Sequence, residues 1–322
     1  MTADGEGGAA PVRLADIELA AARIAGRVRR TPMLRAAPLK ESHCAGDLWL
    51  KLECLQVTGS FKPRGATNKL LSLDEDRTRR GIITASGGNH GLGVAYAGHQ
   101  AGTAAVIYLP EGTPPEKAKK IDAWGAEVRV EGAAWDEANE AALAAAEREG
   151  LTYIHAFADP AVIAGQGTLG LEMLQALPDA ALLVVAIGGG GLISGVATAA
   201  KALKPGIRVV GVEPTGAPTL RESLAAGDLV TLPAIETAAG TLAPRRSEAV
   251  NLEIVSRHVE EIVLVSDEEM RQAARWLWFE LGIAAELSGA AALAALRSGR
   301  VAAQPGEPVI ALVCGAGRDG LD

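Results

Sequence analysis

Between residues 81 and 214, short apolar runs alternate with segments of helical periodicity. The apolar runs are residues 81–85, 104–109, 126–130, 152–154, 182–187 and 208–212. Strands buried on both faces read as continuous apolar runs, and strands that are connected through helices pair in parallel. The alternation therefore predicts an α/β fold in which parallel-rich sheets are covered by helices.

The flanking sequence extends this pattern in both directions. We expect a helix over residues 17–28 and strands over residues 47–53, 261–265 and 308–314, with helices starting near residues 267 and 288. Residues 229–257 are less regular and predict no clear element. A chain of 322 residues has room for two domains. Because no linker interrupts the alternation, the domain boundary must lie within it.

Composition excludes several classes of function. The formal net charge of −8 argues against a nucleic-acid groove. Three widely spaced cysteines exclude a disulfide framework and fit a reducing cytoplasm. The first eleven residues lack the segments of a secretory leader, and we interpret them as an unstructured tail. Residues 180–200 are uncharged, but the glycines in their middle favour a strand, a turn and a helix start over a membrane span.

One lysine follows the strand predicted for residues 47–53, within the stretch 58–66 (TGSFKPRGA). Pro63 disfavours the helical conformation for the residue before it. Pro63 can itself open a helix, because a residue in the first turn needs no N–H partner. We therefore expect Lys62 to be extended, at a strand-to-helix corner, with its amine projecting into a cleft. Taken alone, the pattern is also typical of a solvated lysine.

Four successive glycines at residues 188–191 follow an apolar run and precede a helical segment. Glycines let consecutive backbone N–H groups point into one concavity, and the start of a helix adds partial positive charge. A tight turn without a ligand needs one or two glycines. Four of them therefore favour a phosphate-binding loop.

Two further glycine-rich turns follow predicted strands. Residues 86–91 (SGGNHG) offer backbone donors and the side chains of Asn89 and His90, which would suit a carboxylate or a ring oxygen. Asparagine at a helix start is equally typical of an N-cap. Residues 315–320 match G-x-G-x-x-G, but a dinucleotide fingerprint requires a following helix and a ribose-binding acid, so we reject that interpretation.

Together these stretches resemble the fold-type II pyridoxal-phosphate enzymes, in the branch of the serine/threonine dehydratases and serine racemases. The resemblance covers roughly residues 15–320 and implies a two-domain α/β fold like that of the tryptophan synthase β subunit. It rests on residues 59–66 (GSFKPRGA), 86–91 (SGGNHG), 159–168 (DPAVIAGQGT), 188–192 (GGGGL) and 211–214 (GVEP), and on Cys314-Gly315. We expect residues 1–79 and 159–322 to form a large cofactor-binding domain and residues 80–158 a small domain.

The resemblance also implies a role for each matching residue. Lys62 would bind the aldehyde of pyridoxal 5'-phosphate covalently and act as the catalytic base, which requires a lowered pKa. Phe61 would pack beside the ring, Asn89 would contact the ring hydroxyl oxygen, and Cys314 would face the ring nitrogen. The phosphate would be held by Gly188, Gly189, Gly190, Gly191 and Leu192. The substrate carboxylate would be bound by the loop of Ser86, Gly87, Gly88 and His90.

Three departures from the relatives refine this expectation. Cys314 stands where many relatives have serine, and a neutral thiol makes the cofactor a weaker electron sink, which suits elimination. Gly87 stands where serine racemases carry a serine that acts on the face opposite the lysine. Glu213 and the Ala217 carbonyl would suit a monovalent cation such as potassium, because Thr219 replaces an aspartate of divalent sites. Glu213 is equally typical of a local cap.

We therefore predict a cytoplasmic, homodimeric enzyme that dehydrates and deaminates a small β-hydroxy-α-amino acid, L-threonine or L-serine. The chain ends soon after the last predicted strand, so we expect no regulatory domain like that of the biosynthetic threonine dehydratases. The alternatives are an amino-acid racemase, a β-replacement synthase and a dehydratase of 3-hydroxyaspartate type. A non-catalytic ligand-binding module would not need Lys62. No nucleic-acid or membrane partner is expected.

Overall fold

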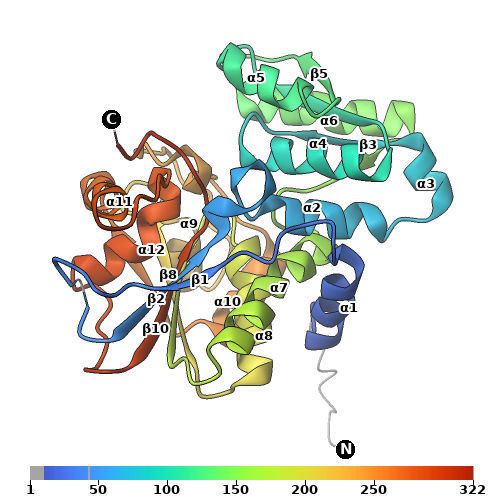
Figure 1. The fold of residues 1–322 in the computed structure, drawn as a ribbon. Coiled ribbons are helices and arrows are strands. Elements are labelled where there is room, and N and C mark those ends of the chain that lie inside the picture. Colours follow the sequence, from blue (N-terminus) through green and yellow to red (C-terminus); the bar gives the residue numbers. More distant parts are fainter. Residues whose placement is uncertain (1–10, 43, 322) are drawn as a thin grey trace, which may run out of the picture.

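The computed structural model describes residues 11–42 and 44–321 and contains two sheets that lie side by side (Figure 1). The larger sheet has the strand order β1-β2-β10-β7-β8-β9. Its strands are β1 (Met33–Arg35), β2 (Asp47–Leu52), β10 (Pro308–Val313), β7 (Leu182–Ala186), β8 (Arg208–Pro214) and β9 (Glu261–Val265). All neighbouring pairs are parallel except β1 with β2. The predicted tail falls mostly on residues 1–10, which lie outside the described residues.

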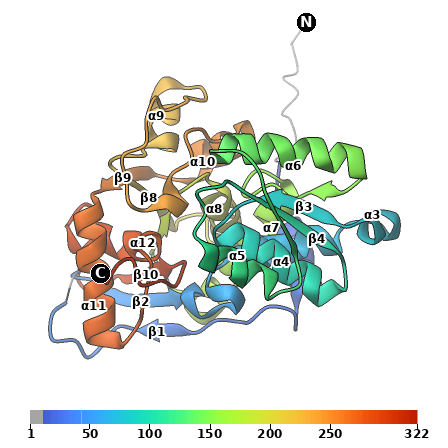
Figure 2. The same ribbon diagram turned by 90° about the horizontal axis from the view of Figure 1, so that it is seen from above.

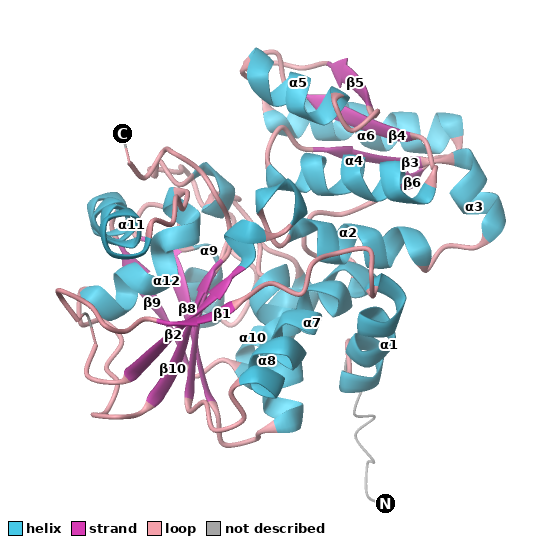
Figure 3. Ribbon diagram, viewed as in Figure 1, coloured by secondary structure: helices cyan, strands magenta, loops and turns pink. Residues whose placement is uncertain are grey.

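Helices cover both faces of the larger sheet (Figure 3). On one side α7, α8 and α10 pack together, and on the other α12 packs against four strands and against α11. These helices are α7 (Pro160–Ala176), α8 (Gly191–Leu203), α10 (Ala249–His258), α11 (Asp267–Leu281) and α12 (Leu287–Arg297), with α1 (Leu14–Ile24) against α7 and α9 (Thr219–Ala226) after β8. Strands β7 and β10 lie between the two layers, which explains their unbroken apolar sequence.

The smaller sheet is wholly parallel, with the order β5-β4-β3-β6. Its elements are β3 (Ile82–Ala85), α4 (Asn89–Ala101), β4 (Ala105–Leu109), α5 (Pro115–Asp122), β5 (Glu127–Val130), α6 (Trp135–Glu149) and β6 (Thr152–Tyr153). Helix α6 lies on one face, while α4 and α5 lie on the other (Figure 2). Both faces of β3 and β4 are thereby buried.

Helix α2 (Lys62–Leu71) connects the two halves of the molecule, because it packs against α4 on one side and α7 on the other. The short helix α3 (Glu75–Arg80) then leads into the smaller sheet. Pro63 stands in the first turn of α2, as predicted. The expected extended conformation of Lys62 is wrong: Lys62 is the first helical residue, and Phe61 before it is already helical, with φ −62° and ψ −16°. Two 3-10 turns, at Glu53–Leu55 and Val57–Gly59, make the corner instead.

The parallel register brings three predicted stretches to one edge of the larger sheet. Strand β10 pairs in parallel with both β2 and β7, so the carboxyl ends of these three strands are neighbours. Strand β2 leads to the turns before Lys62, β7 leads to the four glycines, and β10 leads to Cys314. Ligands of open α/β sheets bind outside the carboxyl ends of strands. This edge is therefore where a site is expected.

The irregular region of the sequence contains one helix that periodicity did not predict, α10, together with a 3-10 turn at Gly240–Leu242. Residues 180–200 fold as the end of a loop, β7, the glycine turn and most of α8. Within the part of the chain that the structure describes, no helix has both the length and the apolar character that crossing a bilayer requires.

Candidate active site

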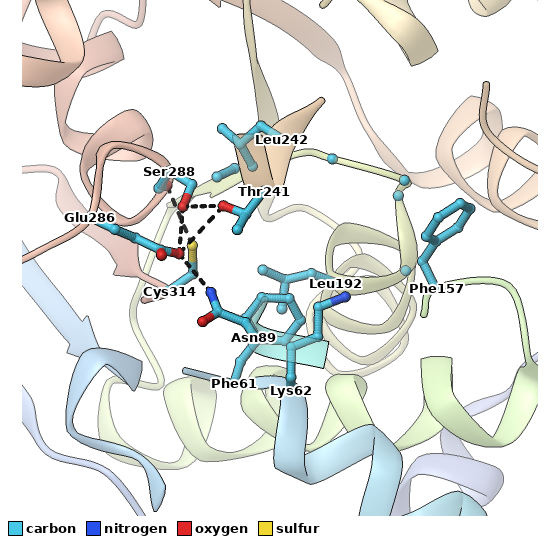
Figure 4. Close-up of a pocket in the computed structure, with 15 residues that line it drawn as sticks. Phe61, Lys62, Asn89, Phe157, Leu192, Thr241, Leu242, Glu286, Ser288 and Cys314 are labelled. Atoms are coloured by element: carbon cyan, nitrogen blue, oxygen red, sulfur yellow. Dashed lines mark hydrogen bonds between the residues drawn. The ribbon is translucent and has the colours of Figure 1, made fainter. Parts of the chain in front are cut away.

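A cavity opens at the carboxyl edge of β2, β10 and β7. Asn89 reaches it from the start of α4, the helix that packs on the smaller sheet (Figure 4). Figure 4 shows Lys62 extending toward Phe157 while a group of polar side chains faces it. The predicted lining residues are Phe61, Lys62, Asn89, Gly188, Gly189, Gly190, Gly191, Leu192 and Cys314. The residues that sequence reasoning missed are Phe157, Ala186, Thr241, Leu242, Glu286 and Ser288.

The amine of Lys62 is held within the cavity by one hydrogen bond. Its Nζ donates to the carbonyl of Ala156 at 2.8 Å and lies 5.2 Å from the centroid of the Phe61 ring. Burial lowers the pKa of Lys62 from 10.5 to about 8, although the nearby Cys314 and Glu286 side chains oppose this shift. A lysine with such a pKa is partly neutral near pH 8 and can accept a proton there.

The four glycines form the turn between β7 and α8, and close packing accounts for each of them. A Cβ on Gly189 would lie 2.2 Å from the Phe157 ring, and one on Gly188 would lie 2.8 Å from the Thr241 carbonyl. Gly190 has a φ of +100°, and a Cβ on Gly191 would lie 2.5 Å from the Phe157 carbonyl. Their number alone therefore does not identify a phosphate loop. That interpretation rests on the turn lining the cavity at the N-terminus of α8.

The opposite wall carries a cluster of hydrogen bonds around Glu286. Its Oε1 accepts from Asn89 Nδ2 at 2.8 Å and from Ser288 Oγ at 2.5 Å, and Thr241 Oγ1 lies 3.4 Å from it. Burial raises the pKa of Glu286 above its ordinary value. Beside it, burial also raises the pKa of Cys314, so this thiol stays neutral, and its Sγ donates to the Ser288 carbonyl at 3.4 Å.

Ser86, Gly87, Gly88 and His90 lie beside the cavity but outside its lining, whereas Asn89 from the same loop is part of the lining. Ser86, Gly87 and Gly88 are partly exposed, and the Gly88 N–H donates to Ser86 Oγ at 3.3 Å. His90 is buried, and its Nε2 lies 2.9 Å from the Ile154 carbonyl. Burial lowers the pKa of His90 to about 3, so the imidazole is neutral. Whether these four residues contact a substrate stays a prediction.

Glu213 and Ala217 lie apart from the cavity lining, at the end of β8 and the approach to α9. The Glu213 side chain is buried and accepts from the Leu220 N–H at 2.8 Å and the Arg221 N–H at 3.0 Å. It therefore caps the start of α9. Burial nevertheless raises its pKa to about 8. The described residues contain no group of three or more His, Cys, Asp or Glu side chains that could hold a metal.

Sequence reasoning missed the residues that reach the cavity from irregular segments. Thr241 comes from a 3-10 turn, Phe157 from the connection after β6, and Glu286 from the residue before α12. No sequence signal points to Phe157, because its packing against Gly189 and Gly191 depends on the fold. No sequence motif distinguishes Glu286 or Thr241 from ordinary helix-capping and loop residues.

Comparisons with known proteins were consistent with one another. A family model described as "Pyridoxal-phosphate dependent enzyme" matches residues 24–315. The L-threonine ammonia-lyase of Thermotoga maritima is 41% identical over 285 residues, which is 88% of this chain and 71% of the relative. Threonine deaminase isoform 2 from Solanum lycopersicum, in its processed form, superposes with a TM-score of 0.89 at 34% identity, covering 95% of this chain and 89% of that one. Maize serine racemase has a TM-score of 0.89 at 33% identity, covering 95% and 94%.

Proposed function

The chain belongs to the family of pyridoxal-phosphate-dependent enzymes, and from this membership we propose that it is a threonine/serine ammonia-lyase. Its substrate is a small β-hydroxy-α-amino acid, L-threonine or L-serine, and its products are a 2-oxo acid and ammonia. The observation that carries the proposal is the joint lining of one cavity by the Lys62 amine, the N-terminus of α8 and the Cys314 thiol. Named relatives at 37–41% identity support the reaction class.

The residues of the cavity fit pyridoxal phosphate. An aldehyde needs an amine of lowered pKa, which Lys62 supplies. A dianionic phosphate needs N–H donors and a helix N-terminus, which the turn before α8 supplies. An aromatic ring needs apolar walls, and Phe61, Ala186 and Leu242 provide them. The neutral thiol of Cys314 is compatible with a ring nitrogen that carries no proton.

We assign the roles of the lining residues accordingly. Lys62 binds the cofactor covalently, Asn89 contacts the ring hydroxyl oxygen, Cys314 faces the ring nitrogen, and Phe61 packs beside the ring. Leu192 and the backbone of the four glycines hold the phosphate. The loop of Ser86, Gly87, Gly88 and His90 holds the substrate carboxylate, for which the partly exposed N–H groups of its glycines are available.

When bound, the cofactor withdraws electrons from the substrate α-carbon and makes its proton labile. Once the substrate amine has replaced Lys62 on the cofactor, Lys62 would take that proton at Nζ, because an amine with a pKa of about 8 is partly neutral near that pH. The β-hydroxyl would then leave as water by taking up one proton, and the unsaturated amine that is released would react with water to give the 2-oxo acid and ammonia. The buried side chains of Ala186, Leu192 and Leu242 form apolar walls of the cavity that contains Lys62.

Elimination rather than racemisation is favoured by Gly87. A racemase needs a second group that returns a proton to the face opposite Lys62, and glycine has no proton to move. The structure adds a steric point: a Cβ on Gly87 would lie 3.0 Å from Cγ2 of Thr113. A β-replacement synthase is a weaker alternative, because the named relatives are lyases.

We further propose that potassium binds at Glu213 and the Ala217 carbonyl. A fully buried carboxylate whose pKa is raised to about 8 is costly to ionise, and a neighbouring cation would lower that cost. Both oxygens already accept N–H donors, so each would have to contact the ion with a remaining lone pair. Activity assays in potassium, magnesium and tetramethylammonium salts test this.

Homodimeric assembly, cytoplasmic location and the division at residues 79/80 and 158/159 also remain predictions. The division is supported by the smaller sheet, whose strands all lie between residues 82 and 153. Light scattering tests the homodimer, cell fractionation tests the location, and limited proteolysis tests the domain division.

A panel of β-hydroxy amino acids, assayed for 2-oxo acid and ammonia, tests the function. L-Threonine, L-serine, 3-hydroxyaspartate and a bulkier hydroxy amino acid should be compared. Borohydride reduction followed by peptide mass spectrometry should place the cofactor on Lys62. Reduction at another lysine, or no turnover of any member of the panel, would contradict the proposal.

A further inference from the structure

Glu286 reaches the cavity from the residue before α12, and the roles assigned above leave it without one. We propose that Glu286 is a positioning residue that fixes the amide of Asn89 with its nitrogen facing the cofactor ring. The inference rests on the proposed function, because the ring oxygen that Asn89 contacts belongs to pyridoxal phosphate. It concerns how this chain prepares the contact before the cofactor arrives.

The hydrogen bonds around Glu286 determine which end of the Asn89 amide faces it. An ionised carboxylate only accepts, so the amide must present its nitrogen. Asn89 Nδ2 lies 2.8 Å from Glu286 Oε1, and Figure 4 shows the amide turned toward the carboxylate. The nitrogen carries two hydrogens, and one of them satisfies Glu286. The other remains for the ring oxygen, which accepts it.

Two hydroxyl groups hold the carboxylate in place. Thr241 Oγ1 donates to Ser288 Oγ at 2.6 Å, and Ser288 Oγ donates to Glu286 Oε1 at 2.5 Å. These donors come from a 3-10 turn and from α12, while Asn89 comes from α4. Two segments, α4 and α12, thus donate directly to one oxygen atom, and the 3-10 turn supports it through Ser288. Such convergence restricts the carboxylate to one orientation.

The glycines after β10 make room for this carboxylate. A Cβ on Gly315 would lie 2.2 Å from Glu286 Oε1, and a Cβ on Gly317 would lie 2.7 Å from Glu286 Cβ. These are the first two glycines of the G-x-G-x-x-G match that was rejected as a dinucleotide fingerprint. Their structural role is to let Glu286 approach Asn89 and Cys314.

The decisive measurement is the affinity of the cofactor-free protein for pyridoxal phosphate, titrated by absorbance. Glu286→Ala removes the acceptor, so the amide of Asn89 can rotate, and we expect affinity to fall about three- to tenfold, the effect of one neutral hydrogen bond. Glu286→Gln keeps an acceptor oxygen and should restore most of the affinity. Glu268→Gln, at an exposed position on α11, serves as the matched control.

A double-mutant cycle tests whether Glu286 acts through Asn89. Asn89→Ala should weaken binding by itself, and adding Glu286→Ala should weaken it no further, because the group that Glu286 positions is absent. Gly315→Ala provides a second route, since the added methyl group displaces the carboxylate while Glu286 remains. It should reproduce the loss seen for Glu286→Ala, including in the case that Glu286→Ala does not fold.

Further outcomes separate this inference from its premise. A purely structural role would lower the unfolding midpoint of the cofactor-free Glu286→Ala protein and leave cofactor affinity unchanged, which overturns the inference. The inference is also overturned if the losses of cofactor affinity in Asn89→Ala and Glu286→Ala add up fully in the double variant. Wild-type protein that binds no pyridoxal phosphate overturns the proposed function and this inference together, whereas normal wild-type binding with an unaffected Glu286→Ala variant overturns only the inference.

Discussion

Helix α2 contributes ionisable side chains to two buried places that differ in how charges are compensated. In one, Arg64 forms ion pairs with Glu53 at 2.8 Å and with Glu172 at 2.7 Å, and Lys51 pairs with Glu172 at 2.5 Å. In the other, Lys62 at the start of the same helix has a carbonyl as its hydrogen-bond acceptor. Within residues 11–42 and 44–321, no ion pair involves Lys62 or Glu286.

The pKa values reflect this difference. Although burial alone would lower the pKa of Arg64, Glu53 and Glu172 raise it, and although burial alone would raise the pKa of Glu172, Arg64 lowers it. In the cavity, burial dominates: it lowers the pKa of Lys62 to about 8 and raises that of Glu286. Paired charges therefore stabilise the helix that carries Lys62. Burial without an ion-pair partner shifts the pKa values of Lys62 and Glu286 toward neutral pH, where they can exchange protons.

Replacing Lys62 with Met gives the largest expected effect. Activity should fall by at least about 10²–10⁴-fold, the range for loss of one general acid or base. The free energy of unfolding of the cofactor-free protein at pH 7 should rise by up to roughly 3 kcal/mol, because a buried amine with a pKa near 8 is costly to protonate. Urea denaturation measures the second effect, with exposed Lys117→Met as the control.

Replacing Arg64 with Met should lower the free energy of unfolding. It leaves the buried Glu53 and the partly buried Glu172 without their guanidinium partner, and breaking a buried pair costs about 3–5 kcal/mol. Arg79→Met, whose partner Asp76 is exposed, should cost less than about 1 kcal/mol. Equal unfolding midpoints for the two variants would show that the buried pairs do not stabilise α2.

The third prediction concerns Glu213, a buried carboxylate that has N–H donors but no cation partner among the described residues. Its folded pKa, about 8, exceeds the ordinary value of 4.5, so the folded state binds more protons between these values. In a buffer free of sodium and potassium, the contribution of Glu213 to the free energy of unfolding, taken as wild type minus Glu213→Gln, should fall as pH rises from about 5 to 8, by up to about 1.4 kcal/mol per unit. Potassium should flatten the slope if it binds there.

Glu213→Gln isolates this contribution, because the amide cannot ionise. Its unfolding free energy should lack the Glu213 contribution in the same buffer and should not respond to potassium. A difference between wild type and Glu213→Gln that does not change with pH would assign the titration to another group.

The predictable parts of the site follow the ends of strands. The family resemblance predicted that Lys62, Cys314 and the four glycines share a site, and the parallel pairing of the strands that precede them explains why they meet. The place of Glu286 in the site could not be predicted from the sequence. Glu286 reaches the cavity beside Gly315, and these two residues become neighbours only after β10 and α12 pack. The conformation of Lys62 was mispredicted because tertiary packing of α2 outweighs the local preference before Pro63.

The smallest effect is expected when a proton donor is added beside the cavity, at the position that the proposed function puts on the face opposite Lys62. Gly87→Ser supplies a hydroxyl group there, and we expect formation of D-serine from L-serine to rise while pyruvate formation continues. The increase should be limited, because the new Cβ would lie 3.0 Å from Thr113 Cγ2 and 3.3 Å from its Oγ1, so Thr113 has to shift by a few tenths of an ångström. Combining Gly87→Ser with Thr113→Ala removes both contacts and should increase D-serine formation further, whereas Thr113→Ala alone should not. Chiral chromatography of the reaction mixtures measures the ratio of D-serine to pyruvate. A wild-type protein that already forms D-serine as fast as pyruvate would show that another group of the cavity returns the second proton, and Glu286, whose pKa burial raises, would be the first to examine.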